Sequence, residues 1–188
     1  MQKVIVLAVL AALIISASGP AARKAPEFVI QTPDGKQTLL SSYRGKNVVL
    51  VFMFTTCAHC QKAAPVLARL QDEYGGKGVQ FLGATFDKDA KKNVADFVRI
   101  FGINFPCGYS TDENIHAFLG LPKDTPTFVP MVTIIDRTGT IRAQHLVTGD
   151  KKDAKKDEAE NAYLADIEKG IRGDLDNLPK AGPASARK

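Results

Sequence analysis

The chain has 188 residues and a formal net charge of +5 at neutral pH, and 45% of its residues are apolar and 24% charged. This composition is ordinary for a soluble globular protein, and it excludes both a disordered chain and a membrane protein with several spanning segments. The length predicts one domain with terminal extensions. The small positive charge does not form a basic face studded with aromatic residues, so no nucleic-acid partner is predicted.

Residues 1–22 have the pattern of a targeting segment. Lys3 supplies a short positive region, residues 4–15 are an unbroken apolar run, and residues 16–18 are small, as a cleavage site requires. The run is shorter than the roughly 20 residues that a spanning helix needs. A cleaved signal peptide is therefore favoured over an uncleaved membrane anchor, and either one predicts an extracytoplasmic protein, periplasmic or secreted.

The chain contains three cysteines, Cys57, Cys60 and Cys107. In an oxidising compartment cysteines either pair structurally or handle the disulfides of other proteins. A bridge between Cys57 and Cys60 closes too short a loop to restrain the unfolded chain much, which favours exchange over a structural role. The same C-x-x-C spacing also makes half of a zinc site, so the motif alone does not decide.

The first half of the chain alternates strands and helices. Residues 48–54 are continuously apolar and predict a strand buried on both faces. A helical stripe follows the cysteines, with a kink expected at Pro65 and an end at Gly75. A second apolar strand over 79–86, followed by Asp87, then leads into a helix that ends before Gly102. This alternation predicts parallel strands joined by right-handed crossovers.

Shorter elements are predicted on either side of this unit. Residues 28–30 are expected to form a short edge strand. After an extended piece at 105–107, a helix is predicted over 112–119, with Asp112 as its N-cap, and then an irregular loop over 120–129. The segments 131–135 and 140–147, with turn residues between them, predict an antiparallel hairpin. A last helix covers 164–175, and 179–188 are predicted to be a flexible tail.

Together these elements predict an α/β fold with a mixed central sheet flanked by helices and with N-terminal extension strands. Their order resembles the thioredoxin fold, and in particular the exported thiol-disulfide oxidoreductases of the TlpA and ResA type within the redoxin group. The resemblance covers residues 26–149. It rests on the following pieces: residues 28–30 with Asp34-Gly35, residues 43–46, the C-x-x-C with Pro65 behind it, Phe105-Pro106, and Pro130 followed by residues 132–139.

The resemblance implies a thioredoxin-like redoxin domain over 26–178 that needs no cofactor and binds no metal. It implies cysteine-containing client proteins, a membrane or soluble redox partner that recharges the dithiol, and a setting such as cytochrome c biogenesis. By the same resemblance Pro130 is a cis-proline facing the dithiol, and the Val129 backbone pairs with the incoming client chain. Pro126 is a competing candidate, but its distance from Asp136 does not fit the pattern.

The position of the C-x-x-C predicts different roles for its two thiols. Cys57 lies at the expected helix start, where unpaired N–H groups and the helix dipole lower a thiol pKa, so it is the predicted nucleophile. Cys60, one turn inside, is expected to be buried and to resolve the mixed disulfide. Ala58 and His59 separate them and are predicted to modulate their chemistry. An imidazolium at His59 would stabilise the Cys57 thiolate and make the disulfide more oxidising, unless the ring only points into solvent.

Three positions depart from the pattern of the TlpA and ResA type. Ala63 replaces the acidic residue that these proteins carry after the second cysteine, and Val51 replaces the buried Asp of thioredoxins. Neither usual proton acceptor is therefore present. Thr56 stands where a Trp often precedes the first cysteine, so different client contacts are expected.

The sequence leaves two rival functions open. A peroxiredoxin shares the scaffold. Its peroxidatic cysteine has a Thr three residues before it, but this chain has Phe54 at that position. A copper-binding protein could use Cys57, His59 and Cys60, whose soft donors suit Cu(I) or zinc, although a second ligand pair is missing.

The remaining cysteine and histidines are not predicted to belong to the site. Cys107 is expected to be a buried free thiol, because a free cysteine behaves as a small hydrophobe. His116 and His145 fall on a predicted helix and a predicted strand, and both are expected to be ordinary surface or core histidines.

Overall fold

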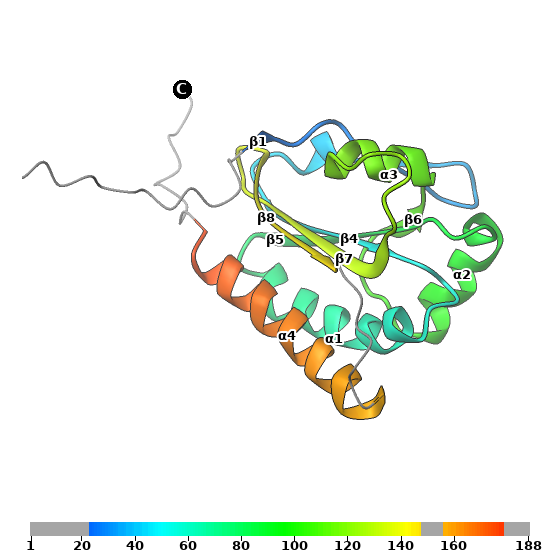
Figure 1. Cartoon of the computed structure of the whole chain (residues 1–188). Coiled ribbons are helices and arrows are strands. Elements are labelled where there is room, and N and C mark those ends of the chain that lie inside the picture. The colour runs from blue at the N-terminus through cyan, green and yellow to red at the C-terminus, as the bar shows by residue number, and fades with distance from the viewer. Residues whose placement is uncertain (1–22, 148–155, 179–188) are drawn as a thin grey trace, which may run out of the picture.

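The computed structural model describes residues 23–147 and 156–178 (Figure 1). The predicted targeting segment over 1–22 and the predicted tail over 179–188 lie outside the described residues. The strands are β1 (Arg23–Lys24), β2 (Val29–Gln31), β3 (Gln37–Leu39), β4 (Asn47–Met53), β5 (Val79–Thr85), β6 (Cys107–Tyr109), β7 (Phe128–Ile135) and β8 (Thr140–Val147). The helices are the 3-10 helix η1 (Leu40–Tyr43), α1 (Ala58–Gly75), α2 (Ala90–Ile100), α3 (Asp112–Leu119) and α4 (Lys156–Asp176).

All eight strands belong to one mixed sheet in the order β1-β8-β7-β4-β5-β6-β2-β3. The strand β4 is central, and all seven of its residues are buried, as its continuous apolar sequence predicts. It pairs in parallel with β5 and antiparallel with β7. The expected mixed sheet is thus confirmed, with the βαβ unit and the hairpin meeting at β4.

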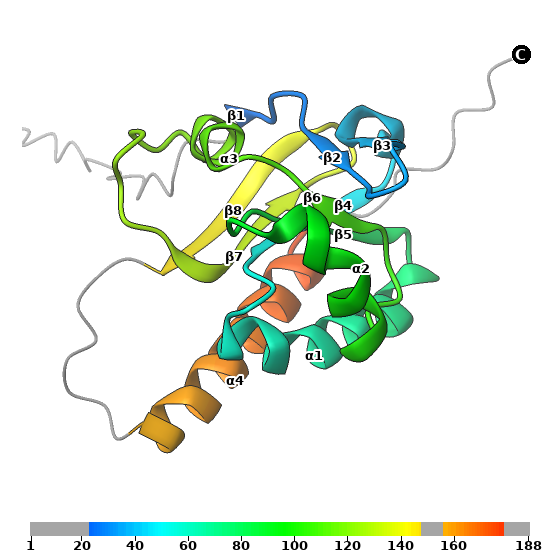
Figure 2. The ribbon, with the colours of Figure 1, turned by 90° about the vertical axis from the view of Figure 1, so that its right-hand side faces the viewer.

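Helices cover both faces of this sheet. The helices α1, α2 and α4 lie on one face, whereas α3 and the chain leading into β2 lie across the other (Figure 1). On the α3 side the ring of Phe52 packs at 5.4 Å from Phe28 and 5.7 Å from Phe118. Figure 2 shows α4 running alongside α1 beneath the sheet. No helix among the described residues is long and apolar enough to cross a membrane.

The helix ends and the hairpin turn that the sequence predicts are present in the structure. Helix α1 continues through Pro65 and ends at Gly75, with Gly76 as its C-cap. Beyond the end of α2, Gly102 has a φ of +67°, a backbone conformation that favours glycine. In the β7–β8 hairpin the Asp136 carboxylate accepts hydrogen bonds from the backbone amides of Thr138 and Thr140.

Three local predictions are wrong. The strand near 28–30 is not at the edge of the sheet, because β2 pairs with β6 on one side and with β3 on the other. Helix α3 is capped by Thr111 and not by Asp112, since the Thr111 side chain accepts from the Asn114 amide. Strand β7 begins at Phe128, inside the segment expected to be an irregular loop.

The placement of β2 depends on a close backbone approach. A Cβ atom added to Gly108 of β6 would lie 2.2 Å from the carbonyl oxygen of Gln31 in β2. Only glycine leaves room for this approach. The strand at this edge of the sheet is β3, which the sequence did not predict, and β1 forms the opposite edge.

Candidate active site

The two cysteines of the C-x-x-C lie where β4 gives way to α1. Cys57 is the N-cap of α1, with φ −81° and ψ 121°, and its backbone carbonyl accepts the first helical hydrogen bond from the Gln61 amide at 3.0 Å. Cys60 lies in the first turn of the helix. Cys57 is partly exposed and Cys60 is 0% exposed. A partner chain can therefore reach the first thiol but not the second.

A strand from the other half of the chain brings the predicted proline to the same place. The Val129–Pro130 peptide bond is cis, and it is the only cis peptide bond within the described ranges 23–147 and 156–178. The Cys57 thiol lies 3.8 Å from the carbonyl oxygen of Val129, within hydrogen-bonding range for sulfur. Pro126 lies in the exposed loop before β7. The structure thus brings together Cys57, Val129 and Pro130.

The environment of Cys57 favours its thiolate. A hydrogen bond from the Cys60 thiol lowers the pKa of Cys57 to about 5, against the opposing effect of burial. The backbone amides of Cys60 and His59 and the side chain of His59 also donate to the sulfur and lower this pKa. The two backbone amides are unpaired N–H groups of a helix N-terminus, which stabilise an anion at this place. At neutral pH Cys57 is therefore ionised.

Cys60 has the opposite environment. Burial is the largest cause that raises its pKa, and the hydrogen bond to Cys57 and the negative charges of Cys57 and Asp87 raise it further. The second thiol thus stays protonated while the first is ionised. One proton is shared unequally by the pair, so the two thiols are chemically distinct.

The two residues between the cysteines are exposed. Ala58 and His59 both face the surface beside Cys57. The His59 side chain nevertheless contributes a hydrogen bond to the Cys57 sulfur. The ring is therefore both solvent-exposed and in contact with the nucleophile, which combines the two alternatives that the sequence left open.

Asp87 is a site residue that was not predicted. One carboxylate oxygen accepts from the Thr55 amide at 2.6 Å, and the other accepts from the Thr55 hydroxyl at 2.7 Å. A signal for it existed in the sequence. The strands ending at residues 53 and 85 are parallel neighbours, so the residues that follow them meet at the same edge of the sheet.

The other candidate residues lie apart from this constellation. Cys107 is a free cysteine, partly buried on β6, where a Cβ on Gly83 would lie 2.7 Å from its sulfur. Burial raises the pKa of Cys107 to about 12. His116 is buried on α3, and His145 on β8 contacts Asp174 of α4 at 2.6 Å. Among residues 23–147 and 156–178 no group of three or more acidic, cysteine or histidine side chains is arranged to hold a metal ion.

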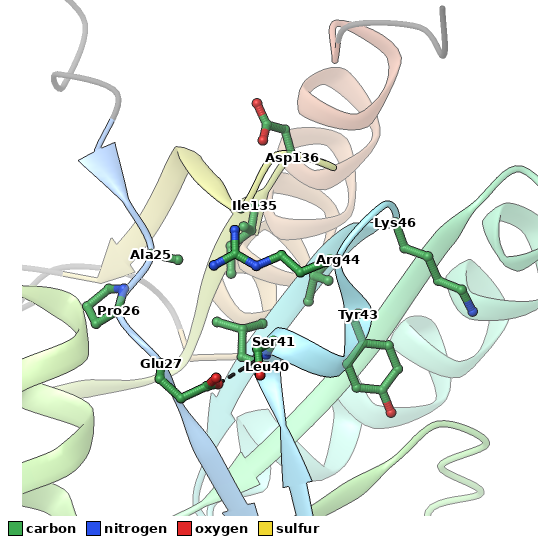
Figure 3. A pocket seen from close by; sticks show the side chains of 12 residues that line it. Ala25, Pro26, Glu27, Leu40, Ser41, Tyr43, Arg44, Lys46, Ile135 and Asp136 are labelled. Carbon is green, nitrogen blue, oxygen red and sulfur yellow. Dashed lines mark hydrogen bonds between the residues drawn. The ribbon is translucent and has the colours of Figure 1, made fainter. Parts of the chain in front are cut away.

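A surface pocket occupies the opposite end of the sheet. It lies between η1, the chain before β2 and the β7–β8 turn, and its walls include Arg44 and Asp136 (Figure 3). Glu27 closes one side, where its carboxylate accepts from the Ser41 amide at 3.0 Å. Ile135, at the far end of β7 from Val129, also lines it. The pocket is therefore separate from the dithiol.

Comparison with known proteins shows the family of the chain. Residues 20–163 match the Redoxin family. The chain belongs to this family. It is 30% identical over 132 residues to the thiol-disulfide oxidoreductase ResA of Geobacillus thermodenitrificans, and the aligned region covers 70% of this chain and 72% of that protein. It is 28% identical over 140 residues to the thioredoxin-like protein YneN of Bacillus subtilis, which covers 71% of this chain and 76% of that one.

A solved structure supports the fold of this redoxin. A thiol:disulfide interchange protein of the thioredoxin family from Chlorobium tepidum superposes with a TM-score of 0.58 at 24% identity, over 80% of this chain and 99% of that one. The expected thioredoxin-like fold and the expected redoxin relationship are both confirmed. The predicted class of enzyme, a thiol-disulfide oxidoreductase, is the class named for the ResA relatives.

Proposed function

We propose that this redoxin is an extracytoplasmic thiol-disulfide oxidoreductase that exchanges disulfides with cysteine-containing client proteins through Cys57 and Cys60. The observation that carries the proposal is the asymmetry of the pair, a partly exposed thiol with a pKa of about 5 beside a fully buried thiol with a raised pKa. Exchange needs one thiolate that attacks and a second thiol that releases the intermediate. The catalytic domain is proposed to span residues 26–178.

The reductive cycle begins with attack by the Cys57 thiolate on a client disulfide. A Cys57–client S–S bond forms, and the other client sulfur leaves as a thiolate that takes up a proton. Cys60 then loses its proton and attacks Cys57, so that the Cys57–Cys60 bond forms and the second client sulfur leaves. The client gains two electrons and the dithiol loses two. The oxidative cycle is the reverse.

The carbonyl oxygen of Val129 is proposed to act in client binding. It lies within 3.8 Å of the Cys57 sulfur, so a client backbone amide next to the reacting cysteine can donate to it. Such pairing would place a short extended segment of the client beside the first residues of β7. Ala58 and His59, which follow Cys57 in the chain, are exposed.

The dithiol is proposed to be more oxidising than that of a typical ResA-type reductase. Donors to the Cys57 sulfur, including His59, stabilise the thiolate and hence the reduced form, which raises the reduction potential of the disulfide. The targeting pattern of residues 1–22 supports export, either with cleavage or as an anchor. A membrane or soluble redox partner would recharge the pair, and cytochrome c biogenesis is a suitable setting.

Two cysteine variants test the proposed function. Cys57→Ser is expected to abolish the reduction of insulin disulfides, because it removes the attacking thiolate. Cys60→Ser is expected to accumulate mixed disulfides with client proteins, since nothing resolves them. Gel mobility with and without a reductant measures the trapped species. Full insulin reduction by Cys57→Ser would refute the assignment of this dithiol.

A further inference from the structure

His116 lies on α3, and the loop that follows this helix leads into β7. The loop covers residues 120–127 and joins the two elements (Figure 2). Its residues 122–124 and 126 are exposed. The contacts that fix the path of the loop are therefore made by its less exposed residues.

His116 contacts this loop at two points. Its backbone carbonyl oxygen accepts from the Leu121 amide at 2.9 Å, where the loop leaves the helix. The residue is 4% exposed, and its Nε2 atom lies 3.0 Å from the carbonyl oxygen of Thr125. A carbonyl oxygen only accepts, so the ring nitrogen is the donor in this bond. The Nδ1 atom lies 2.9 Å from the Asp112 carbonyl oxygen, so the ring ties the loop to the first turn of α3.

The residues after Thr125 carry the Val129 carbonyl, which the sheet itself holds only in part. Strand β4 pairs with β7 over Met131–Ile135, beyond Val129. The pairing of β7 with β8 is irregular between Phe128 and Val132. The bond at Thr125, four residues before Val129, therefore supplies a second constraint on the position of this carbonyl.

The position of the Val129 carbonyl matters because of what lies beside it. Its oxygen lies 3.8 Å from the Cys57 sulfur. A client backbone amide next to the reacting cysteine can donate to this oxygen only while the oxygen stays at that place. A shift of about 1 Å takes a hydrogen bond of ordinary length out of range.

We propose that His116 is a positioning residue for client binding, which holds the loop at Thr125 and thereby keeps the Val129 carbonyl beside Cys57. It acts through the backbone and not on the sulfur atoms. A client that pairs with Val129 therefore depends on His116, whereas a small disulfide without a backbone amide does not. This proposal rests on the proposed exchange function.

The experiment compares two mixed disulfides that share thionitrobenzoate as the leaving group. One contains a short capped peptide with a single cysteine, and the other contains mercaptoethanol. In each, the Cys57 thiolate attacks the peptide or mercaptoethanol sulfur and forms a new S–S bond, the old S–S bond breaks, and thionitrobenzoate leaves as a coloured thiolate. The ratio of the two rate constants measures the contribution of the peptide backbone, because the ionisation of Cys57 is common to both reactions.

Three substitutions of His116 separate its two ring contacts. His116→Phe fills the space of the ring without its donors, and we expect it to lower the ratio about threefold to tenfold while the mercaptoethanol reaction stays within about twofold of the wild type. His116→Gln can place an amide donor near the position of Nε2, so it is expected to keep most of the ratio. His116→Asn can place its amide only near the position of Nδ1, which faces Asp112, so its ratio is expected to fall as in His116→Phe.

A second histidine serves as the control. His145 lies on β8 and contacts Asp174 of α4, so His145→Phe is expected to keep the ratio of the wild type. An unchanged ratio in His116→Phe, or an equal loss of both reactions, would overturn the proposal. If His116→Phe does not fold, the comparison of His116→Gln with His116→Asn decides, and equal ratios in these two variants would overturn it.

The outcome distinguishes this proposal from the proposed function. If the wild type releases no thionitrobenzoate from either compound, exchange by Cys57 itself fails. If the wild type reacts with both compounds and the His116 variants keep its ratio, only the role of His116 fails.

Discussion

The two thiols of the C-x-x-C differ because one helix start supplies opposite environments three residues apart. Cys57 receives hydrogen bonds from Cys60, from two backbone amides and from His59, whereas Cys60 is surrounded by the core. The largest single cause of the low Cys57 pKa is the bond from the Cys60 thiol. The resolving cysteine thus also activates the nucleophile.

This dependence predicts a difference between two substitutions of Cys60. Cys60→Ala removes the donor and is expected to raise the Cys57 pKa above about 5 by roughly one to two pH units, because a hydrogen bond to a charged group contributes about 1.5–3 kcal/mol. Cys60→Ser keeps a hydroxyl donor and is expected to stay closer to the wild type. The pH dependence of Cys57 alkylation by iodoacetamide, followed by mass spectrometry, measures both. Equal profiles for the two variants would contradict the assigned cause.

Single residues of the site could be predicted from the sequence only where a local motif fixes their position. The C-x-x-C after an apolar strand places Cys57 at a helix start, and the position of Cys60 follows from the helical turn. Asp87 is 30 residues from Cys57, and nothing local marks it as a partner of Thr55. Its contact with Thr55 depends on β4 and β5 ending at the same edge of the sheet. It also depends on Thr55 being the loop residue whose backbone amide faces Asp87.

At the scale of elements, His116 connects α3 to the loop that leads into β7. Its Nδ1 atom lies 2.9 Å from the Asp112 carbonyl oxygen and its Nε2 atom 3.0 Å from the Thr125 carbonyl oxygen. Both partners are acceptors, so both ring nitrogens donate only when the ring is protonated, whereas a neutral ring satisfies one carbonyl and not the other. The bond to Thr125 is the main cause that raises the His116 pKa, and the carboxylates of Asp112 and Asp124 add to it.

This contact predicts a pH-dependent contribution to stability. Because the folded-state pKa is raised, the stabilisation is complete below the ordinary value near 6.5 and is lost as the pH rises through the folded-state pKa. His116→Ala is expected to lower the free energy of unfolding by about 1–3 kcal/mol more at pH 6 than at pH 8.5. Urea unfolding of the oxidised protein, in which Cys57 does not titrate, measures this difference. A loss that is equal at both pH values would contradict a protonated His116.

Helix α4 contains two glycines that differ in the space around them, Gly170 and Gly173. A Cβ on Gly170 would lie 2.8 Å from Cε1 of His145, whose ring is held by Asp174, whereas a Cβ on Gly173 has nothing within 4 Å. Gly173→Ala is expected to stabilise the protein by up to about 1 kcal/mol through helix propensity. Gly170→Ala is expected to lose that gain and to lower the melting temperature, because the His145 ring must move. Two equal shifts in melting temperature would show that α4 does not pack on β8 as described.

Periodicity predicted the long elements of this fold, but not how the short ones pair. The apolar runs of β4 and β5 and the stripe on α1 are each sufficient to identify a strand or a helix. The pairing of β2 with β6 depends on Gly108 allowing the Gln31 carbonyl to approach, a contact 77 residues apart along the chain. The cap at Thr111 was missed because Thr111 and Asp112 are both good capping residues and differ by one position.

At the scale of the whole molecule, the ionisation of Cys57 couples the redox state to stability. The folded-state pKa of Cys57 is lowered to about 5, so the reduced form gains stability as the pH rises from about 5 and loses it as the pH falls through that value. The raised pKa of Cys60 acts in the opposite sense, but only above about pH 8.5, where an unfolded thiol ionises. The oxidised form has neither thiol.

The melting temperature of the reduced protein is therefore expected to rise, relative to that of the oxidised protein, between pH 5 and pH 8. The contribution of His116 is common to both forms and cancels in the difference. Calorimetry of the two forms across this range measures the effect. A difference that does not change with pH would contradict the low pKa of Cys57.

The central claim is that Cys57 and Cys60 form an exchanging dithiol whose reduced state is stabilised by the thiolate. The reduction potential of the purified protein, measured by equilibration in glutathione buffers, tests this claim most directly. We predict a reversible two-electron transition at a potential well above the value of about −270 mV that is found for thioredoxin. A potential at or below that value, or no transition that depends on both cysteines, would contradict it.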